Sequence, residues 1–453
     1  MQDTQGSAAP AGSDAEAAAM RRGQLVPVRW RIFGFLFGIG FLAYLQQRSL
    51  TVAAARIIPE LHISQMQIGF LEQAFVIGYA LFQIPGGVFG QRWGARWTFL
   101  GIGCLSLLAV TLTAMAPLAL TGASLFVMLI AAQFLLGVSQ APIFPVSTGV
   151  FESWFQPQRW ALVQGLQTMG LSLGAALAPP FIAALMITIG WQKALLWTAA
   201  PAIPLYLWWA WYGRNSPREH ASVSQRELDL LQDTGAEQAN ARLSLRELLE
   251  ILRDRNVLLL ALSYLAMNYV FYLLANWCFL YLIQQRGFSM LEGGWLAVAP
   301  PIAAGIGAGL GGVIASALFV RLGSRRGLRL TPLLALPAAG VLLIVAVHAA
   351  NAYVAVAVLA LCYGLVELTE GSYWAAAMTI GRSNTMAVGG VLNTGGNLGG
   401  VIGIPVVAYL SGHGSWTAAF LIGTGFALLS AVAWLGIDAS RCVGSTLPVA
   451  HHE

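Results

Sequence analysis

The chain has 453 residues, of which 57% are hydrophobic and 9% are charged, whereas a soluble domain carries about 25% charged residues. This composition excludes an ordinary soluble protein, and the long apolar runs exclude an outer-membrane barrel, whose strands alternate apolar and polar residues. Because only helices satisfy their own backbone polar groups in lipid over such lengths, we predict an all-α polytopic membrane protein.

Twelve apolar segments follow one another along the chain, each close to the roughly 20 residues that a spanning helix needs. A polar stretch separates the first six from the last six. We therefore expect a disordered tail over 1–30, a six-helix bundle over 31–212, a linker over 213–256, a second six-helix bundle over 257–437 and a tail over 438–453.

The linker contains two capping-box patterns, Ser224 with Glu227 and Ser244 with Glu247. Each pattern is followed by leucines, which predicts two short amphipathic helices on the membrane surface. The alternative is a plain tether between the bundles.

The basic residues predict the orientation. Of the 24 lysines and arginines, only Arg56, Lys193 and Arg286 fall on one side of the predicted spans, and Arg48 falls inside a span. We expect the protein in the inner (plasma) membrane of the cell, and the positive-inside rule predicts that both termini lie in the cytoplasm. The net positive charge reflects this rule, and no basic face with interleaved aromatics indicates nucleic-acid binding.

Several patterns count against an enzyme. The run Gly307 to Gly312 matches GxGxxG formally, but it lies within a predicted span and follows no strand, so we interpret it as close helix packing. No nucleophile–base constellation, metal-ligand spacing or phosphate loop is present in the sequence. We expect no catalytic residues, no metal and no cofactor.

Weak internal repetition links the two halves. A glycine- and arginine-rich stretch, Gly86 to Arg96, follows the second predicted helix, and Gly311-Gly312 with Arg321 to Arg326 occupies the equivalent place in the second half. Duplicated transporters show such repeats.

The sequence around the second helix resembles the major facilitator superfamily, and more narrowly its anion–cation symporter branch, which includes sugar-acid transporters. The resemblance covers about residues 30 to 437. It implies two six-helix bundles related by inverted repeats, a solute site between them, alternating access and a monomer. The matching stretches are Gly69-Phe70-Leu71, Gly78-Tyr79-Ala80, Gln83 to Gly87, Leu136-Gly137, Ala141 to Pro145, Gly190-Trp191, and Asn393 through Asn397 to Pro405.

Arg48 is the leading candidate for binding an anion. An arginine at mid-membrane costs roughly 2.5–3.5 kcal/mol, and its guanidinium fork suits a carboxylate. The resemblance implies that an arginine here holds the carboxylate of the solute, with Tyr44 one turn earlier and Tyr79 contacting the solute as well. The alternative is a structural ion pair of Arg48 with a buried acid. Near the outer end of helix 2, we expect Glu72 to pair with Arg56.

Helix 10 carries an unusual polar face. Tyr363, Glu367, Glu370 and Trp374 follow the spacing of one helix face. Two carboxylates this close cannot both ionise cheaply in a low dielectric, which suits proton coupling, a cationic group of the solute, or a charge pair with Arg48. The alternative is a polar helix contact.

Neutral polar residues complete the predicted cavity. Asn268 and Tyr272 in helix 7 and Asn393 in helix 11 suit a hydroxylated ligand, as do Gln164, Gln167 and Thr168 in helix 5. Interhelical hydrogen bonding explains any one of them equally well. We predict that Tyr44, Arg48, Tyr79, Asn268, Tyr272, Trp374 and Asn393 bind the solute.

The chain departs from the resembled family at several acids. The family has an acid at Gln91, in the gating loop to which we also assign Arg92, Gly94 and Arg96, and many members have one at Gln47. In helix 4 the family commonly has an arginine and a proton-binding glutamate. Glutamines, which cannot titrate, stand at these positions, Gln133 and Gln140.

These observations predict secondary transport of a small carboxylated solute, such as a sugar acid or related organic anion, with protons coupled through Glu367 and Glu370. Two alternatives stay open. The protein could be an uncoupled facilitator of an organic anion or zwitterion, or a membrane sensor that binds without transporting. The lipid bilayer and the small solute are the expected partners.

Overall fold

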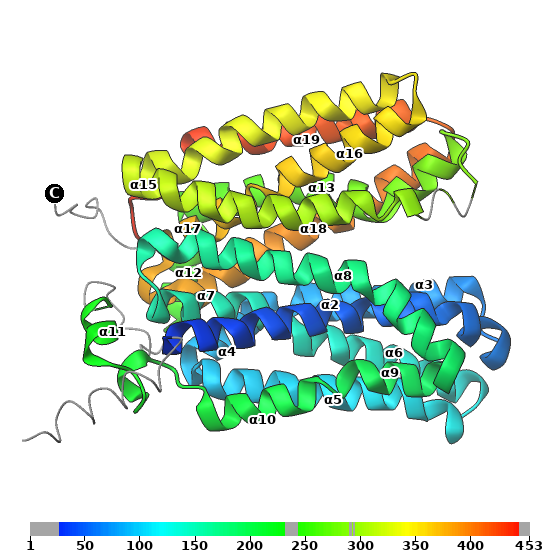
Figure 1. Ribbon diagram of the computed structural model, residues 1–453, viewed down its shortest axis with the longest axis horizontal. Helices are drawn as coiled ribbons and strands as arrows, with labels where there is room; N and C mark the ends of the chain where they lie inside the picture. The colour runs from blue at the N-terminus through cyan, green and yellow to red at the C-terminus, as the bar shows by residue number, and fades with distance from the viewer. Residues whose placement is uncertain (1–26, 232–242, 290–291, 293–294, 444–453) are drawn as a thin grey trace, which may run out of the picture.

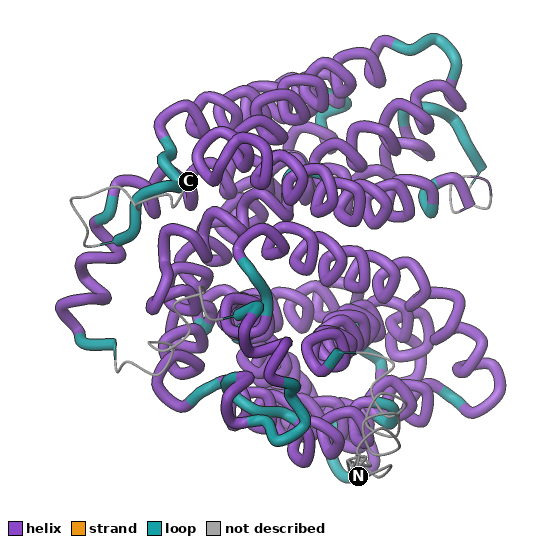
Figure 2. Tube along the Cα trace, turned by 60° about the vertical axis from the view of Figure 1, so that its left-hand side comes forward, coloured by secondary structure: helices purple, strands orange, loops and turns teal. Residues whose placement is uncertain are grey.

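The computed structural model describes residues 27–231, 243–289, 292 and 295–443, and this part of the chain contains helices and no strand (Figure 2). Most of both predicted tails lies outside the described residues, as does part of the linker. Within the described part, eight helices are long and apolar enough to cross a membrane, or nine if the bent pair α3–α4 forms one span.

The remaining membrane crossings lie in helices that are either longer or shorter than one span. α15 (Ala299–His348) reverses direction at Gly323, so that it crosses twice (Figure 1). The stretch Ala352–Gly412 contains the consecutive helices α16, α17 and α18. α9 and α10 are each short but follow one another as one crossing. The arrangement therefore accounts for the twelve predicted spans.

The helices form two groups that lie side by side (Figure 1). The N-terminal bundle contains α2 (Val28–Leu61), α3 (Gln65–Leu81), α4 (Gln83–Trp93), α5 (Ala95–Met115), α6 (Gly122–Gln140), α7 (Ile143–Trp154), α8 (Trp160–Ile189), α9 (Trp191–Ala199) and α10 (Ala202–Tyr212). The C-terminal bundle contains α13 (Arg255–Gln284), α15, α16 (Ala352–Glu367), α17 (Glu370–Gly381), α18 (Thr385–Gly412) and α19 (Trp416–Gly436).

The internal repeat has a structural counterpart in two glycines. Gly94, between α4 and α5, has φ 81° and ψ 159°, and Gly323, between the two crossings of α15, has φ 76° and ψ 174°. Glycine adopts positive φ without a steric penalty. The equivalent loops of the two bundles therefore turn in the same conformation.

The linker forms the two predicted short helices, α11 (Gln225–Asp229) and α12 (Leu245–Arg253). The capping box of Ser244 and Glu247 is confirmed in full. The first box is only half present. Ser224 accepts from the backbone N–H of Glu227, but the Glu227 carboxylate instead accepts from the backbone N–H groups of Val28 and Arg29, at 3.3 and 3.0 Å. The linker is thereby attached to the start of α2.

The bundles are packed tightly at the end where α11 and α12 lie, which we call the linker end. α18 packs there against α4 and α7, and both α17 and α15 pack against α8. Met386 of α18 lies against Gly87 and Gly90 of α4 and Gly149 of α7, where an added Cβ would collide with its atoms. The GxGxxG run packs closely, as predicted: a Cβ on Gly307 or Gly311 would collide with a neighbouring backbone carbonyl.

A candidate solute-binding cavity

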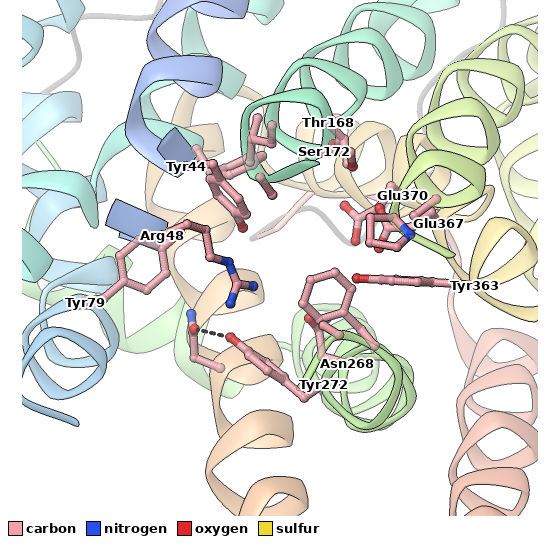
Figure 3. Close-up of a pocket in the computed structure, with 18 of the residues that line it drawn as sticks. Tyr44, Arg48, Tyr79, Thr168, Ser172, Asn268, Tyr272, Tyr363, Glu367 and Glu370 are labelled. Atoms are coloured by element: carbon pink, nitrogen blue, oxygen red, sulfur yellow. Dashed lines mark hydrogen bonds between the residues drawn. The ribbon is translucent and has the colours of Figure 1, made fainter. Parts of the chain in front are cut away.

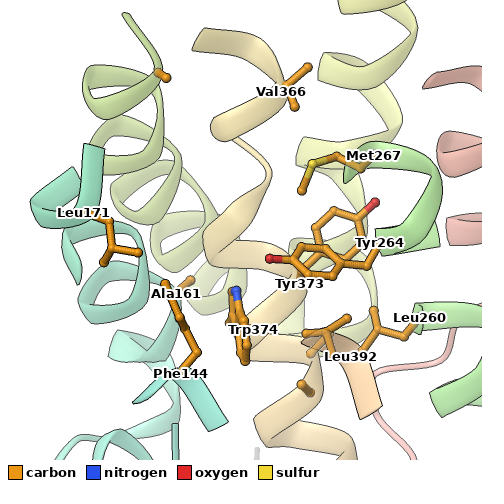
Figure 4. Close-up of a cluster of buried hydrophobic side chains, with 14 of the residues drawn as sticks. Phe144, Ala161, Leu171, Leu260, Tyr264, Met267, Val366, Tyr373, Trp374 and Leu392 are labelled. Atoms are coloured by element: carbon orange, nitrogen blue, oxygen red, sulfur yellow. The ribbon is translucent and has the colours of Figure 1, made fainter. Parts of the chain in front are cut away.

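A cavity of about 470 Å³ lies between the two bundles, within the range of about 300–1,000 Å³ that is usual for small-ligand pockets. Its floor includes Phe144 of α7, which stacks on the buried Trp374 of α17 with ring centroids 5.3 Å apart (Figure 4). Its walls continue away from the linker end through Pro179 of α8, Phe279 of α13 and Pro301 of α15. The cavity is therefore closed at the linker end and extends toward the opposite end.

Arg48 of α2 extends its guanidinium into this cavity (Figure 3). Its neighbours on the cavity wall include Tyr44, one turn earlier, and Tyr272 of the facing bundle. Among the described residues, no acid lies within ion-pair distance of Arg48 and no hydrogen-bond acceptor is paired with it. The structural ion pair is thus absent in this conformation, and the guanidinium remains available to an anion.

The glutamines at two of the departing positions, Gln133 and Gln140, are hydrogen-bonded to neutral groups of the N-terminal bundle. Gln140 of α6 donates to Gln46 of α2 at 3.2 Å, and Gln46 donates to the carbonyl oxygen of Thr198 at 3.4 Å. Gln133 donates to the hydroxyl of Thr113 at 3.1 Å. These neutral bonds take the place of charged groups, so no group at these positions can take up or release a proton.

Glu370 is held firmly by two donors. The hydroxyl of Tyr264 lies 3.0 and 3.2 Å from its two carboxylate oxygens, and the indole Nε1 of Trp374 donates at 2.8 Å. Its side chain is 5% exposed. Hydrogen bonds to ionised groups are roughly twice as strong as neutral ones, so these donors stabilise a carboxylate at a fixed position.

Glu367 lies on the same wall in a different environment. Glu367 ends α16 and Glu370 begins α17, with Leu368 and Thr369 between them, so the predicted continuous helix face from Tyr363 to Trp374 is interrupted there. Glu367 is 2% exposed and lines the cavity (Figure 3), yet no described side chain or backbone group donates a hydrogen bond to it. The two acids therefore have different surroundings, which spacing alone did not indicate.

Trp374 corrects one prediction. It was expected to line the cavity, but it is fully buried and is absent from the cavity wall. It packs under the floor against Phe144 and donates to Glu370. Its effect on a bound solute is therefore indirect.

The remaining predicted binding residues line the cavity. Asn393 of α18 donates to Gln83 at 2.9 Å and lies 3.5 Å from the hydroxyl of Tyr79, so it joins the bundles. The Tyr272 hydroxyl donates to Asn397 at 3.2 Å (Figure 3), and Asn268 donates to the carbonyl oxygen of Tyr264 at 2.9 Å. Ligand contact and interhelical bonding both fit Asn393 and Tyr272, whereas the bond of Asn268 lies within α13.

The predicted gating loop contributes mainly within its own bundle. The Arg96 guanidinium donates to the carbonyl oxygen of Ala210 at 2.6 Å, and its backbone N–H donates to Asn215 at 2.9 Å. Arg92 lies over the ring of Trp93 at 5.8 Å. The cross-bundle contact of this region comes from Gln91, whose amide donates to the Ser383 carbonyl oxygen.

The predicted pairing of Glu72 with Arg56 is wrong. Glu72 accepts from the Thr51 hydroxyl at 2.8 Å, and no ion pair joins it to Arg56. Sequence reasoning also missed several wall residues, among them Phe144, Ser172, Tyr264 and Phe271. Tyr264 could have been found, because it lies one turn before Asn268 on the same helix face.

Comparisons with known proteins agree with this arrangement. Residues 36–385 match the family model of the Major Facilitator Superfamily. The chain is 27% identical to the probable sulfoacetate transporter SauU of Cupriavidus necator, over 93% of this chain and 96% of that protein. It is 26% identical to the hexuronate transporter of Bacillus subtilis, over 88% and 92%. The solved structure of the proton:xylose symporter XylE has a TM-score of 0.73 and 13% identity, and covers 91% of this chain and 96% of that one. This last likeness concerns the fold alone.

Proposed function

The chain belongs to the Major Facilitator Superfamily, and we propose that it is a secondary transporter that moves a small carboxylated organic solute across the inner membrane by alternating access. The observation that carries this proposal is Arg48, a cation with no partner among the described residues, which extends into the cavity between the bundles. Because an unpaired arginine is costly in a membrane, an anion that pairs with it recovers this cost.

The similar transporters support the class of solute. Sulfoacetate and hexuronates, named for two of them, carry acid groups. We therefore propose a sugar acid or a related organic anion. Tyr44, Tyr79, Tyr272, Asn268 and Asn393 supply hydroxyl and amide groups to its remaining polar atoms.

The closed linker end supports alternating access. The basic residues favour a cytoplasmic position for this end, and on that orientation we propose that the described conformation is outward-open. Rocking one bundle against the other would separate α18 from α4 and α7 and expose the same residues to the cytoplasm.

Coupling to a cation requires a group other than the amides of Gln133 and Gln140 in α6. Glu367 and Glu370 are the acids on the cavity wall, and we propose that this pair receives either a proton or a cationic group of the solute. The neutral bonds of Gln133 and Gln140 favour a second candidate, an uncoupled facilitator.

Counterflow into proteoliposomes tests the proposal. With a panel of carboxylates, we expect wild type and the exposed-site control Arg246→Ala to exchange at least one acid, and Arg48→Ala to lose that exchange. Exchange by Arg48→Ala at the wild-type rate would refute the anion site. Ligand binding without exchange by the wild type would indicate a sensor instead.

A further inference from the structure

Two ionisable side chains of opposite charge type on the cavity wall have no partner among the described residues. Arg48 comes from α2 of the N-terminal bundle, and Glu367 comes from α16 of the C-terminal bundle. Figure 3 shows both side chains at the cavity, on different walls. No ion pair joins them.

We infer that Glu367 binds an ammonium group of the solute whose carboxylate Arg48 holds, so that the transported solute is a small zwitterion such as an amino acid. This inference rests on the proposed function, because it takes the Arg48 anion site as given. It commits the second site to a cationic group rather than to a proton, and it takes an amino-bearing acid, in place of a sugar acid, as the carboxylated solute.

The wall around Glu367 offers acceptors that an ammonium group can use. The hydroxyl oxygen of Thr168 is buried on the cavity wall and has no hydrogen-bond partner. Ser172 lies one turn further along α8 and lines the cavity as well. An ammonium group has three N–H donors, so it can bond to Glu367 and to a hydroxyl together. A proton on Glu367 would provide a single donor.

Aromatic rings lie on the same side of the cavity. Phe271 and Tyr363 line it and contact one another edge to face, with centroids 5.6 Å apart. Aromatic faces attract ammonium cations.

The charge of Glu367 favours a solute with an ammonium group over a neutral polyol. A sugar hydroxyl could also donate to Glu367, but it would leave a carboxylate without a counter-charge once the cavity closes, and an unpaired buried charge is strongly unfavourable. Glu370 is the poorer site for the ammonium group, because Tyr264 and Trp374 already donate to it.

Matched solutes that differ only in this group provide the test. We would titrate purified full-length protein with pairs of equal chain length, β-alanine with β-hydroxypropionate and γ-aminobutyrate with γ-hydroxybutyrate, and extend the series to longer chains. Dissociation constants come from the ligand-dependent rise in Tm. The variants are Glu367→Gln, which keeps the side-chain shape, and Glu250→Gln on α12 as a matched control away from the cavity.

For at least one chain length, we expect wild type and Glu250→Gln to bind the amine at least about tenfold more tightly than the alcohol, since hydrogen bonds to charged groups are worth that much. In Glu367→Gln the preference should fall to near one, with binding of the alcohol retained. That retained binding also shows that the variant is folded.

Preferred binding of the alcohols, or an unchanged amine preference in Glu367→Gln, would overturn the inference. So would a Glu367→Gln variant that binds as wild type does but no longer responds to a pH gradient in proteoliposomes, because Glu367 would then carry a proton. Failure of the proposed function is distinguishable: no carboxylate of either kind would bind, or Arg48→Ala would bind all of them normally.

Discussion

The closed linker end predicts that a single methyl group on α4 will shift the transport cycle. An added Cβ on Gly87 would collide with the backbone carbonyl oxygen of Met386, and would lie 3.1 Å from the carbonyl carbon. A backbone group cannot swing away as a side chain can. Because Met386 belongs to the other bundle, Gly87→Ala penalises this conformation and spares one in which the linker end is open.

The size of the effect follows from two opposing terms. Overpacking a tight contact costs about 1–3 kcal/mol. Replacing a helical glycine by alanine gains up to about 1 kcal/mol of helix stability, but α4 is helical in both conformations, so this gain cancels. The ratio of outward-open to inward-open molecules should therefore fall by about tenfold or more, since 1.4 kcal/mol is a factor of ten.

Cysteine labelling measures this ratio. In a chain whose four native cysteines are replaced, Ala175→Cys reports the outer cavity wall, and Thr148→Cys, buried at the linker end, reports its opening. Gly87→Ala should slow labelling at the first site and speed it at the second. Gly69→Ala on α3, where an added Cβ meets nothing within 4 Å, is the matched control. If Gly87→Ala folded and labelled as the control does, the linker end would not be the gate.

Three further predictions concern other contacts. Trp374→Phe keeps the stacking on Phe144 but removes the donor at 2.8 Å from Glu370. Solute affinity should therefore fall by about ten- to 150-fold in a titration of Tm, the range for one hydrogen bond to a charged group. Unchanged affinity would show that Glu370 needs no such support. Glu227→Gln weakens the attachment of the linker to the first N–H groups of α2. Tm should fall by a few degrees, because about 1 kcal/mol of stability is lost at a helix N-terminus. Glu219→Gln is the control, and equal Tm values for the two variants would argue against this contact. Burial, and then the nearby Arg214, lowers the pKa of His220 below its ordinary value of 6.5. As the pH falls, the unfolded chain therefore binds a proton at this histidine before the folded chain does, and stability should decline below about pH 6.5. The variant His220→Asn should show a shallower decline of Tm with falling pH.

The fold could be predicted from the sequence because hydropathy and helix length are tied to bilayer thickness. The capping box at Ser244 follows from local sequence and is found as predicted. The first linker box is only half right because its acid, Glu227, is recruited by a helix almost 200 residues away in the chain. Such a tertiary contact has no local signal.

The candidate site was less predictable than the fold. Helix spacing placed Arg48, Tyr272 and Glu367 on faces that do line one cavity. The same spacing placed Trp374 with them, yet the interruption at Leu368 and Thr369 and the stack on Phe144 bury it below the floor. Glu72 accepts a hydrogen bond from Thr51 and does not pair with Arg56. Periodicity indicates which residues share a face, whereas the neighbouring helix decides which of them reaches the cavity.

The distribution of charge between the bundles gives the departures from the resembled family a common meaning. In the N-terminal bundle, neutral glutamines stand at positions where that family has charged residues, and among the described residues no acid pairs with Arg48. The acids of the cavity wall belong to the C-terminal bundle. A direct Arg48–Glu367 ion pair could satisfy both charges only if the bundles closed on an empty cavity, and the described conformation contains no such pair. A solute that carries both charges satisfies the same two groups while it occupies the cavity, so that closure becomes favourable when solute is bound, as alternating access requires.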